Sequence, residues 1–270
     1  MVKQKTPAGA PAGAFDAGWK ALYAIGGSAA LLAGIVFRRN LGVEVSLFVA
    51  QQPPESAADW FALLQANRLL GLAYLAIFDV VNYALVALML LALVAVLWRA
   101  NKSLMAVAGM LGFLGIAAYF ASNTALSLLA LSDQYALAAS EAERLLLLAA
   151  GQSLLALNRF GMASAHPGSG GYLSLLFVAA AGLITALVML RSGLFSKLAA
   201  WVGIAAAGLD LAYCLAFLLV PASAGEHLPV LFLPLAGLLY MVWHIMVGWR
   251  LVRLGRTEGK AVASLQRSVG

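Results

Sequence analysis

The chain has 270 residues, of which 63% are hydrophobic and only 10% are charged, and its mean hydropathy is +0.93. A soluble domain of this length would carry far more charge, so this composition excludes a soluble globular protein. The net charge of +6 does not indicate nucleic acid as a partner, because the excess lies in short loops and at the C-terminus, where membrane topology places lysine and arginine.

The hydropathy pattern divides the chain into three parts. Residues 1–18 are polar and rich in proline and glycine, and we expect a disordered cytoplasmic lead. Residues 19–252 are predicted to form a single transmembrane domain, and residues 253–270 a basic cytoplasmic tail. The class is all-α, because several apolar runs reach the ~18–20 residues that a helix needs to cross a bilayer. The six predicted membrane-spanning helices lie near residues 19–37, 69–97, 104–131, 172–190, 198–220 and 229–250.

The distribution of lysine and arginine predicts the orientation of this six-helix bundle. With six spans, the N-terminus, the two short basic loops at 99–102 and 191–197 and the C-terminal tail fall on one side. The positive-inside rule makes that side cytoplasmic, so both termini are predicted to face the cytoplasm of a bacterial inner membrane. Arg38 and Arg39 fall on the opposite side, against the rule.

Residues 144–160 form an apolar stretch that is too short and too interrupted by polar residues for a seventh span. We expect an interfacial or re-entrant helix on the outer face instead. Ser140 and Glu143 have the spacing of a capping box at its start. The two long outer loops, near 40–67 and 132–171, are predicted to cap the bundle, with Trp60 at the membrane interface.

The sequence contains no motif of known enzyme chemistry. It lacks a nucleophile elbow, a Walker loop, a zinc-protease motif and a dinucleotide fingerprint. Cys214 is the sole cysteine, and only His244 of the three histidines falls in a predicted span. We therefore expect no cofactor and no metal site, and the motifs do not favour an enzyme.

Polar residues inside the predicted spans are the candidate functional residues. A carboxylate at the bilayer centre costs ~2.5–3.5 kcal/mol on insertion scales, so an acid there should face the bundle interior or a water-filled cavity. Removal from water also favours the protonated acid. The candidates for a polar cavity are Asp79, Asn82, Asn123, Asp210, Tyr213 and His244.

These residues leave two interpretations open. Asn82 and Asn123 have the character of interhelical hydrogen bonds, whereas Asp79 and Asp210 favour a functional cavity. The first interpretation is a small permease or proton-coupled carrier with a small-molecule or proton substrate. The second is a non-transporting membrane module, such as a sensor, assembly factor or partner subunit, which binds another membrane protein. A lipid enzyme with an outward pocket joining Asp79 to His166 or His227 is a third candidate. In each case the lipid bilayer is a partner.

The order of these features resembles a known family. The resemblance rests on the stretches VMLRSGLFSKLAAWVGI and LPLAGLL followed by W and VG. It covers residues 65–252, which are similar to the bacterial integral membrane proteins of domain of unknown function 4386. The resemblance implies a helical membrane protein. It transfers no catalytic or binding residue to this chain.

Overall fold

The computed structural model describes residues 17–50, 54–75, 77–157, 168–220 and 228–256, with side chains described outside 36–50 and 228–231. Secondary structure in the described residues is entirely helical, which confirms the all-α class. The predicted lead and tail lie mostly outside these residues. The long helices are α1 (Lys20–Ala50), α4 (Ile77–Leu97), α5 (Lys102–Ser122), α8 (Ser169–Ser192), α9 (Lys197–Leu219) and α11 (Leu228–Arg256). The shorter ones are the 3-10 turn η1 (Ala17–Trp19), α2 (Ala57–Ala66), α3 (Arg68–Tyr74), α6 (Ala125–Leu137) and α7 (Glu141–Leu157).

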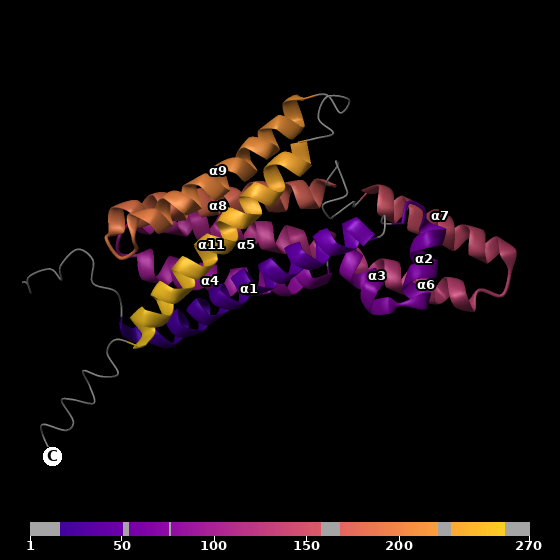
Figure 1. Ribbon diagram of the computed structural model, residues 1–270, viewed down its shortest axis with the longest axis horizontal. Coiled ribbons are helices and arrows are strands. Elements are labelled where there is room, and N and C mark those ends of the chain that lie inside the picture. The colour runs from indigo at the N-terminus through magenta and orange to yellow at the C-terminus, as the bar shows by residue number, and fades with distance from the viewer. Residues whose placement is uncertain (1–16, 51–53, 76, 158–167, 221–227, 257–270) are drawn as a thin grey trace, which may run out of the picture.

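The six long helices form a ring in chain order. Each packs against the helix before it and the helix after it, and α11 returns to pack against α1 (Figure 1). Short turns join α4 to α5 and α8 to α9, whereas α2 and α3 lie between α1 and α4, and α6 and α7 lie between α5 and α8. A ring of this kind has no helix at its centre, and this leaves room for the cavity described below.

Close approach of α1 to α11 closes the ring. A Cβ atom built on Gly27 would lie 2.7 Å from the backbone nitrogen of Val252 and 2.9 Å from the carbonyl oxygen of Gly248. A Cβ atom on Gly248 would lie 2.8 Å from the carbonyl oxygen of Gly27. Only glycine permits two helix backbones to come this near, as is common where membrane helices cross.

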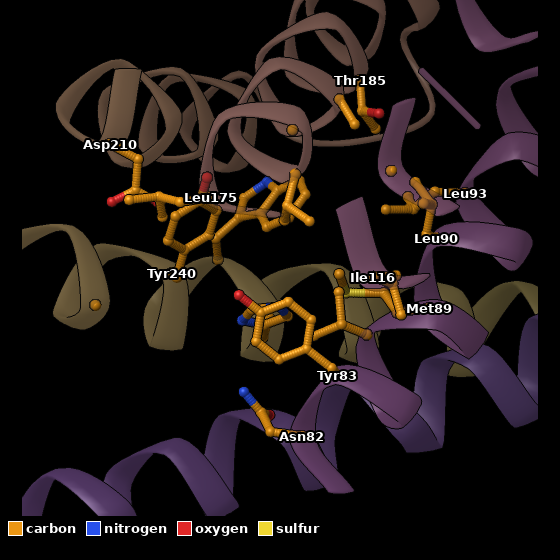
Figure 2. A pocket seen from close by; sticks show the side chains of 18 of the residues that line it. Asn82, Tyr83, Met89, Leu90, Leu93, Ile116, Leu175, Thr185, Asp210 and Tyr240 are labelled. Atoms are coloured by element: carbon orange, nitrogen blue, oxygen red, sulfur yellow. The ribbon is translucent and has the colours of Figure 1, made fainter. Parts of the chain in front are cut away.

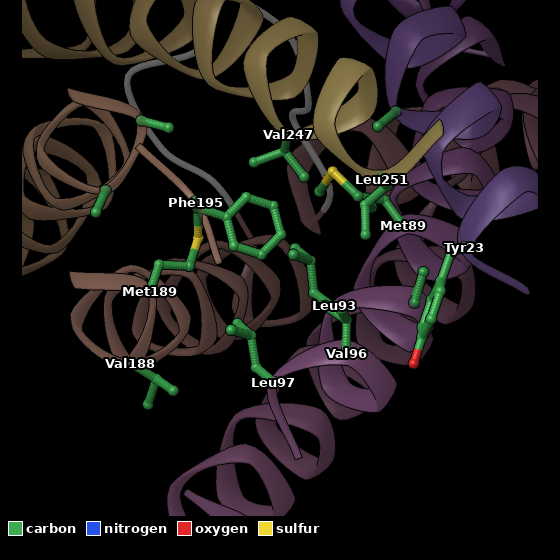
Figure 3. Close-up of a cluster of buried hydrophobic side chains, with 14 of the residues drawn as sticks. Tyr23, Met89, Leu93, Val96, Leu97, Val188, Met189, Phe195, Val247 and Leu251 are labelled. Carbon is green, nitrogen blue, oxygen red and sulfur yellow. The ribbon is translucent and has the colours of Figure 1, made fainter. Parts of the chain in front are cut away.

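The ring is filled by apolar side chains at the end where α4 ends and α5 begins. Val96 and Leu97 from α4 meet Val247 and Leu251 from α11, and Phe195 inserts from the turn between α8 and α9 (Figure 3). All five are buried. This packed cluster closes the interior of the ring at that end.

The same end has the chemistry of a membrane interface. Exposed cations there include Arg99, Lys102, Arg191, Lys197 and Arg250. Four of the six tryptophans are exposed, and all four lie near this end: Trp19, Trp98, Trp201 and Trp249. Tryptophan belts and cationic loops are both typical of the headgroup region, so this end is called the basic end below.

Two of the predicted spans are divided in the structure. The span expected at 69–97 consists of α3 and α4, and no proline or glycine marks the division after Leu75. The span expected at 104–131 falls on α5 and the first part of α6. Between these two helices the Asn123 side chain accepts a hydrogen bond from the backbone N–H of Ala125 at 3.1 Å. The first helix continues beyond its predicted end at 37, to Ala50.

Helices α2, α3, α6 and α7 gather beyond the other end of the long helices (Figure 1), and we call this group the cap. The cap has a hydrophobic core of its own, which includes Phe61, Leu64 and Leu128. Trp60 belongs to this core, and its position at the membrane interface stays a prediction. The predicted 144–160 helix is α7, and it packs against α2 and α6.

Polar contacts hold the cap together. The buried hydroxyl of Ser132 donates to the carbonyl oxygen of Phe61 at 3.3 Å, and the Gln152 side chain accepts from the backbone N–H of Ala57 at 3.0 Å. Ser140 caps α7 as predicted, since its hydroxyl accepts from the N–H of Glu143. The Glu143 carboxylate accepts from Ala139, one residue earlier than a capping box requires.

Among the described residues, five helical segments are long and apolar enough to cross a membrane: Ile77–Leu97, Lys102–Leu137, Ser169–Ser192, Lys197–Leu219 and Phe232–Arg256. The chain is therefore a multi-pass membrane protein. Within α1, residues Lys20–Ile35 form a shorter apolar stretch. A sixth span through α1, the re-entrant position of α7 and the cytoplasmic side of the basic end stay predictions.

Candidate functional site: a central cavity

A cavity of about 230 Å³ lies inside the ring, beyond the packed cluster of the basic end. Five of the long helices contribute its walls, and α1 contributes none of the described lining side chains. Instead, α1 packs across α4 and α11. Most of the wall is apolar, with Val86, Met89, Leu90, Leu93, Ile116, Leu175, Val178 and Leu233.

Helical periodicity explains which residues face the cavity. On α4 the lining positions are 82, 83, 86, 89, 90 and 93, and on α11 they are 233, 237, 240, 243 and 244. These positions, some of them adjacent pairs, recur every three or four residues and so select one face of each helix. On α8, Gly182 keeps the wall open, because it places no side chain opposite the Tyr240 hydroxyl.

Five polar groups at this cavity are buried and have no hydrogen-bond partner among the described residues. They are the Asn82 side-chain oxygen, the Thr185 and Tyr240 hydroxyls, the Trp243 indole nitrogen and His244 Nδ1. Buried polar groups in proteins are almost always paired, and each exception calls for an explanation. Five exceptions at one cavity indicate a place for a polar ligand or for ordered water.

Asp210 is the acid of the cavity. It lies on α9, its side chain is 6% exposed, and no lysine or arginine is among the described lining residues. Its carboxylate faces the Tyr240 hydroxyl of α11 without the geometry of a hydrogen bond (Figure 2). Tyr83 of α4 points its hydroxyl into the same space, within electrostatic reach of Asp210 and of Asp79.

The structure brings together three of the six predicted site residues. Asn82, Asp210 and His244 line the cavity. Asp79 does not line it, but lies in the first turn of α4, one turn before Tyr83, with its side chain half-buried. The two acids therefore do not share the cavity wall.

Asn123 and Tyr213 also lie outside the cavity wall. Asn123 ends α5, and its amide nitrogen donates to the Tyr119 hydroxyl at 3.3 Å. Tyr213 is buried on α9, with its ring centroid 6.3 Å from that of Phe217. Both residues therefore make local contacts at the cap side of the ring.

Sequence reasoning missed Tyr83, Thr185, Tyr240 and Trp243. A signal for three of them is present, because Tyr83 adjoins Asn82, and Tyr240 and Trp243 share a helix face with His244. Their spacing alone does not distinguish a cavity from an ordinary packed interface. Thr185 follows no polar neighbour on its helix, so it carries no such signal.

The described residues contain no group of three or more histidine, cysteine, aspartate or glutamate side chains that could hold a metal ion.

Comparison with known proteins gives one result. Residues 20–255 match the family model described as "Domain of unknown function (DUF4386)". Comparisons with curated proteins and with solved structures gave no match. Because the match covers most of the 270 residues, the chain belongs to the DUF4386 family of proteins of unknown function.

Proposed function

We propose that this protein is a small permease whose central cavity holds a small molecule during its passage across the membrane. The single observation that carries the proposal is the convergence of five buried, unpaired polar groups on one cavity. Leaving such a group unsatisfied costs about 1–3 kcal/mol. A ligand that pairs with several of these groups would recover part of that free energy, which makes the cavity a favourable binding chamber.

The alternative is a non-transporting module in which buried polar residues only hold helices together. Polar groups with that role are paired with one another, as in the cap, where Ser132 bonds Phe61 and Gln152 bonds Ala57. The polar groups of the cavity lack such partners. This contrast within one chain favours a ligand chamber over structural bonds.

Passage through the ring requires a route to both faces of the membrane. The packed cluster around Val96, Phe195 and Leu251 separates the cavity from the basic end. A permease would have to open this cluster to release its substrate at the basic end. Within the cavity, Asp210 would hold a proton or a cationic group. Rearrangement of packed helices around a central site is the usual mechanism of alternating access.

Cysteine labelling tests this proposal without knowledge of the substrate. Because Cys214 is the sole cysteine, a Cys214→Ala background gives a thiol-free protein. Thr185→Cys then places a thiol at the cavity, and Leu187→Cys places one on the exposed, lipid-facing surface of the same helix. The reagent is methanethiosulfonate ethyltrimethylammonium, applied to intact cells and to inverted membrane vesicles.

The proposal expects Thr185→Cys to react from both sides, and much faster than Leu187→Cys. Reaction from one side only would favour the non-transporting module, because the cavity would then never open to the other face. No reaction from either side would contradict both the permease and any water-accessible chamber. Lys102→Cys, at the exposed start of α5 at the basic end, reports that the reagent reaches that face.

A further inference from the structure

We propose that the molecule held in the cavity is a small apolar organic cation, such as a protonated amine or an ammonium compound that carries a hydrocarbon group. This assignment rests on the proposed function, since it presumes that the cavity receives a ligand. It adds the chemical class of that ligand.

The charge of the lining favours a cation. Asp210 is the sole carboxylate among the described lining residues, and no lysine or arginine lies there to neutralise it. An anionic ligand would meet this carboxylate with no opposing charge in a water-poor site. A cationic ligand would form the missing ion pair, and such pairs are strong where both charges are shielded from water.

Three aromatic side chains from α4 and α11 line the same space. Tyr83 from α4 and Tyr240 from α11 project toward it from different helices (Figure 2). Trp243 follows one turn after Tyr240, with ring centroids 6.0 Å apart and planes inclined at 68°. Faces of tyrosine and tryptophan rings attract cations, and clustered aromatic rings recognise quaternary ammonium groups in proteins.

The unpaired polar atoms and the apolar walls also suit an organic cation. The Asn82 side-chain oxygen can accept a hydrogen bond, as can the Tyr240 and Thr185 hydroxyls, so an amine with N–H donors would pair with them. The remaining wall is formed mainly by aliphatic side chains such as Val86, Leu90 and Ile116. A cavity of about 230 Å³ with such walls suits a compact hydrocarbon group beside the charge.

A pair of isosteric probes separates charge from shape. Benzyltrimethylammonium and neopentylbenzene have the same shape, because a carbon atom replaces the charged nitrogen in the second. Phenylmethanesulfonate supplies an anion of similar size. Binding of each probe to the full-length protein in lipid nanodiscs is measured by equilibrium dialysis. The variants are Asp210→Asn and, as a matched removal of one negative charge on the exposed surface, Glu141→Gln.

We expect the wild-type protein and Glu141→Gln to bind benzyltrimethylammonium more tightly than neopentylbenzene, and Asp210→Asn to bind the ammonium about thirtyfold or more weakly. In Asp210→Asn the preference over neopentylbenzene should largely disappear. Tyr240→Phe, which keeps the ring, should bind the ammonium nearly as well as the wild type, whereas Tyr240→Leu should bind it more weakly. Because the leucine variant keeps an apolar side chain, its weaker binding of the ammonium would report on the loss of the aromatic ring.

Equal affinity for the charged and the neutral probe would overturn the assignment of a cation, as would tighter binding of phenylmethanesulfonate. Binding of none of the probes would also overturn it. None of these outcomes decides the permease proposal, which depends on labelling of Thr185→Cys from the two sides. Labelling from both sides without ammonium binding would leave a permease for a different class of substrate.

Discussion

Gly27 on α1 and Gly248 on α11 lie backbone to backbone, each filling the space that a Cβ atom of the other would need. This contact joins the first and the last long helix of the ring. In the described part of the cavity lining, α1 contributes no side chain, so this contact closes the ring outside the cavity wall.

Gly248→Leu should destabilise the protein by about 1–3 kcal/mol, because the new side chain would collide with the backbone of α1. The measurement is thermal unfolding in detergent. Gly208→Leu is the control, since a Cβ atom there would meet no atom within 4 Å. An equal loss in both variants would show that a leucine in the helix, and not the contact with Gly27, causes the effect.

Gly182→Val should fill the cavity without unfolding the protein. A Cβ atom at Gly182 would lie 3.3 Å from the Tyr240 hydroxyl and 3.7 Å from Ala207, which is tight but tolerable. The larger side chain would occupy the space where a ligand binds. We expect Gly182→Val to abolish labelling of Thr185→Cys, while Gly208→Val leaves it unchanged. Undiminished labelling in Gly182→Val would contradict the position of the chamber.

Two buried hydroxyls with different surroundings allow a paired test of stability. The Tyr240 hydroxyl has no hydrogen-bond partner, whereas the Ser132 hydroxyl donates to the carbonyl of Phe61. Tyr240→Phe should therefore be neutral or stabilising, and Ser132→Ala should destabilise by about 1 kcal/mol. Both are measured by thermal unfolding. Marked destabilisation by Tyr240→Phe would mean that the Tyr240 hydroxyl makes a structural hydrogen bond, as the non-transporting alternative requires.

Phe61→Ala tests whether the cap and the ring are separate units of packing. Phe61 is fully buried in the core of the cap, and its loss should destabilise the cap by about 3–5 kcal/mol. Limited proteolysis should then cut within the cap helices α2, α3, α6 or α7, while labelling of Thr185→Cys at the cavity persists. Loss of both would show that the cavity needs the cap.

Composition and hydropathy were sufficient for the class, because long apolar runs admit few structures other than membrane helices. They did not locate the divisions within the helices. At Asn123 the side-chain amide oxygen accepts a hydrogen bond from the backbone N–H of Ala125, in place of a backbone carbonyl. In a continuous helix the same side chain could equally have pointed outward, so the sequence does not predict the division. After Leu75 no residue type signals a division at all.

The candidate site was predicted in part for a similar reason. Insertion energetics predict that Asp79 and Asp210 face the bundle interior, and Asp210 lines the cavity. Insertion energetics do not specify which part of the bundle interior an acid faces. They therefore place Asp79 together with Asp210, although Asp79 lies outside the cavity wall. The tyrosines and Trp243 were overlooked because aromatic residues are common in membrane helices, and their role depends on the gap between five helices.

The most direct test of the central claim is protection of a cavity thiol by the proposed ligand. Thr185→Cys in the Cys214→Ala background is labelled in the presence and absence of benzyltrimethylammonium and of neopentylbenzene. The account predicts that the ammonium slows labelling in a saturable manner, that neopentylbenzene has much less effect, and that Asp210→Asn loses the protection. Labelling that proceeds at the same rate with and without the ammonium would contradict a cation-binding chamber at the centre of the ring.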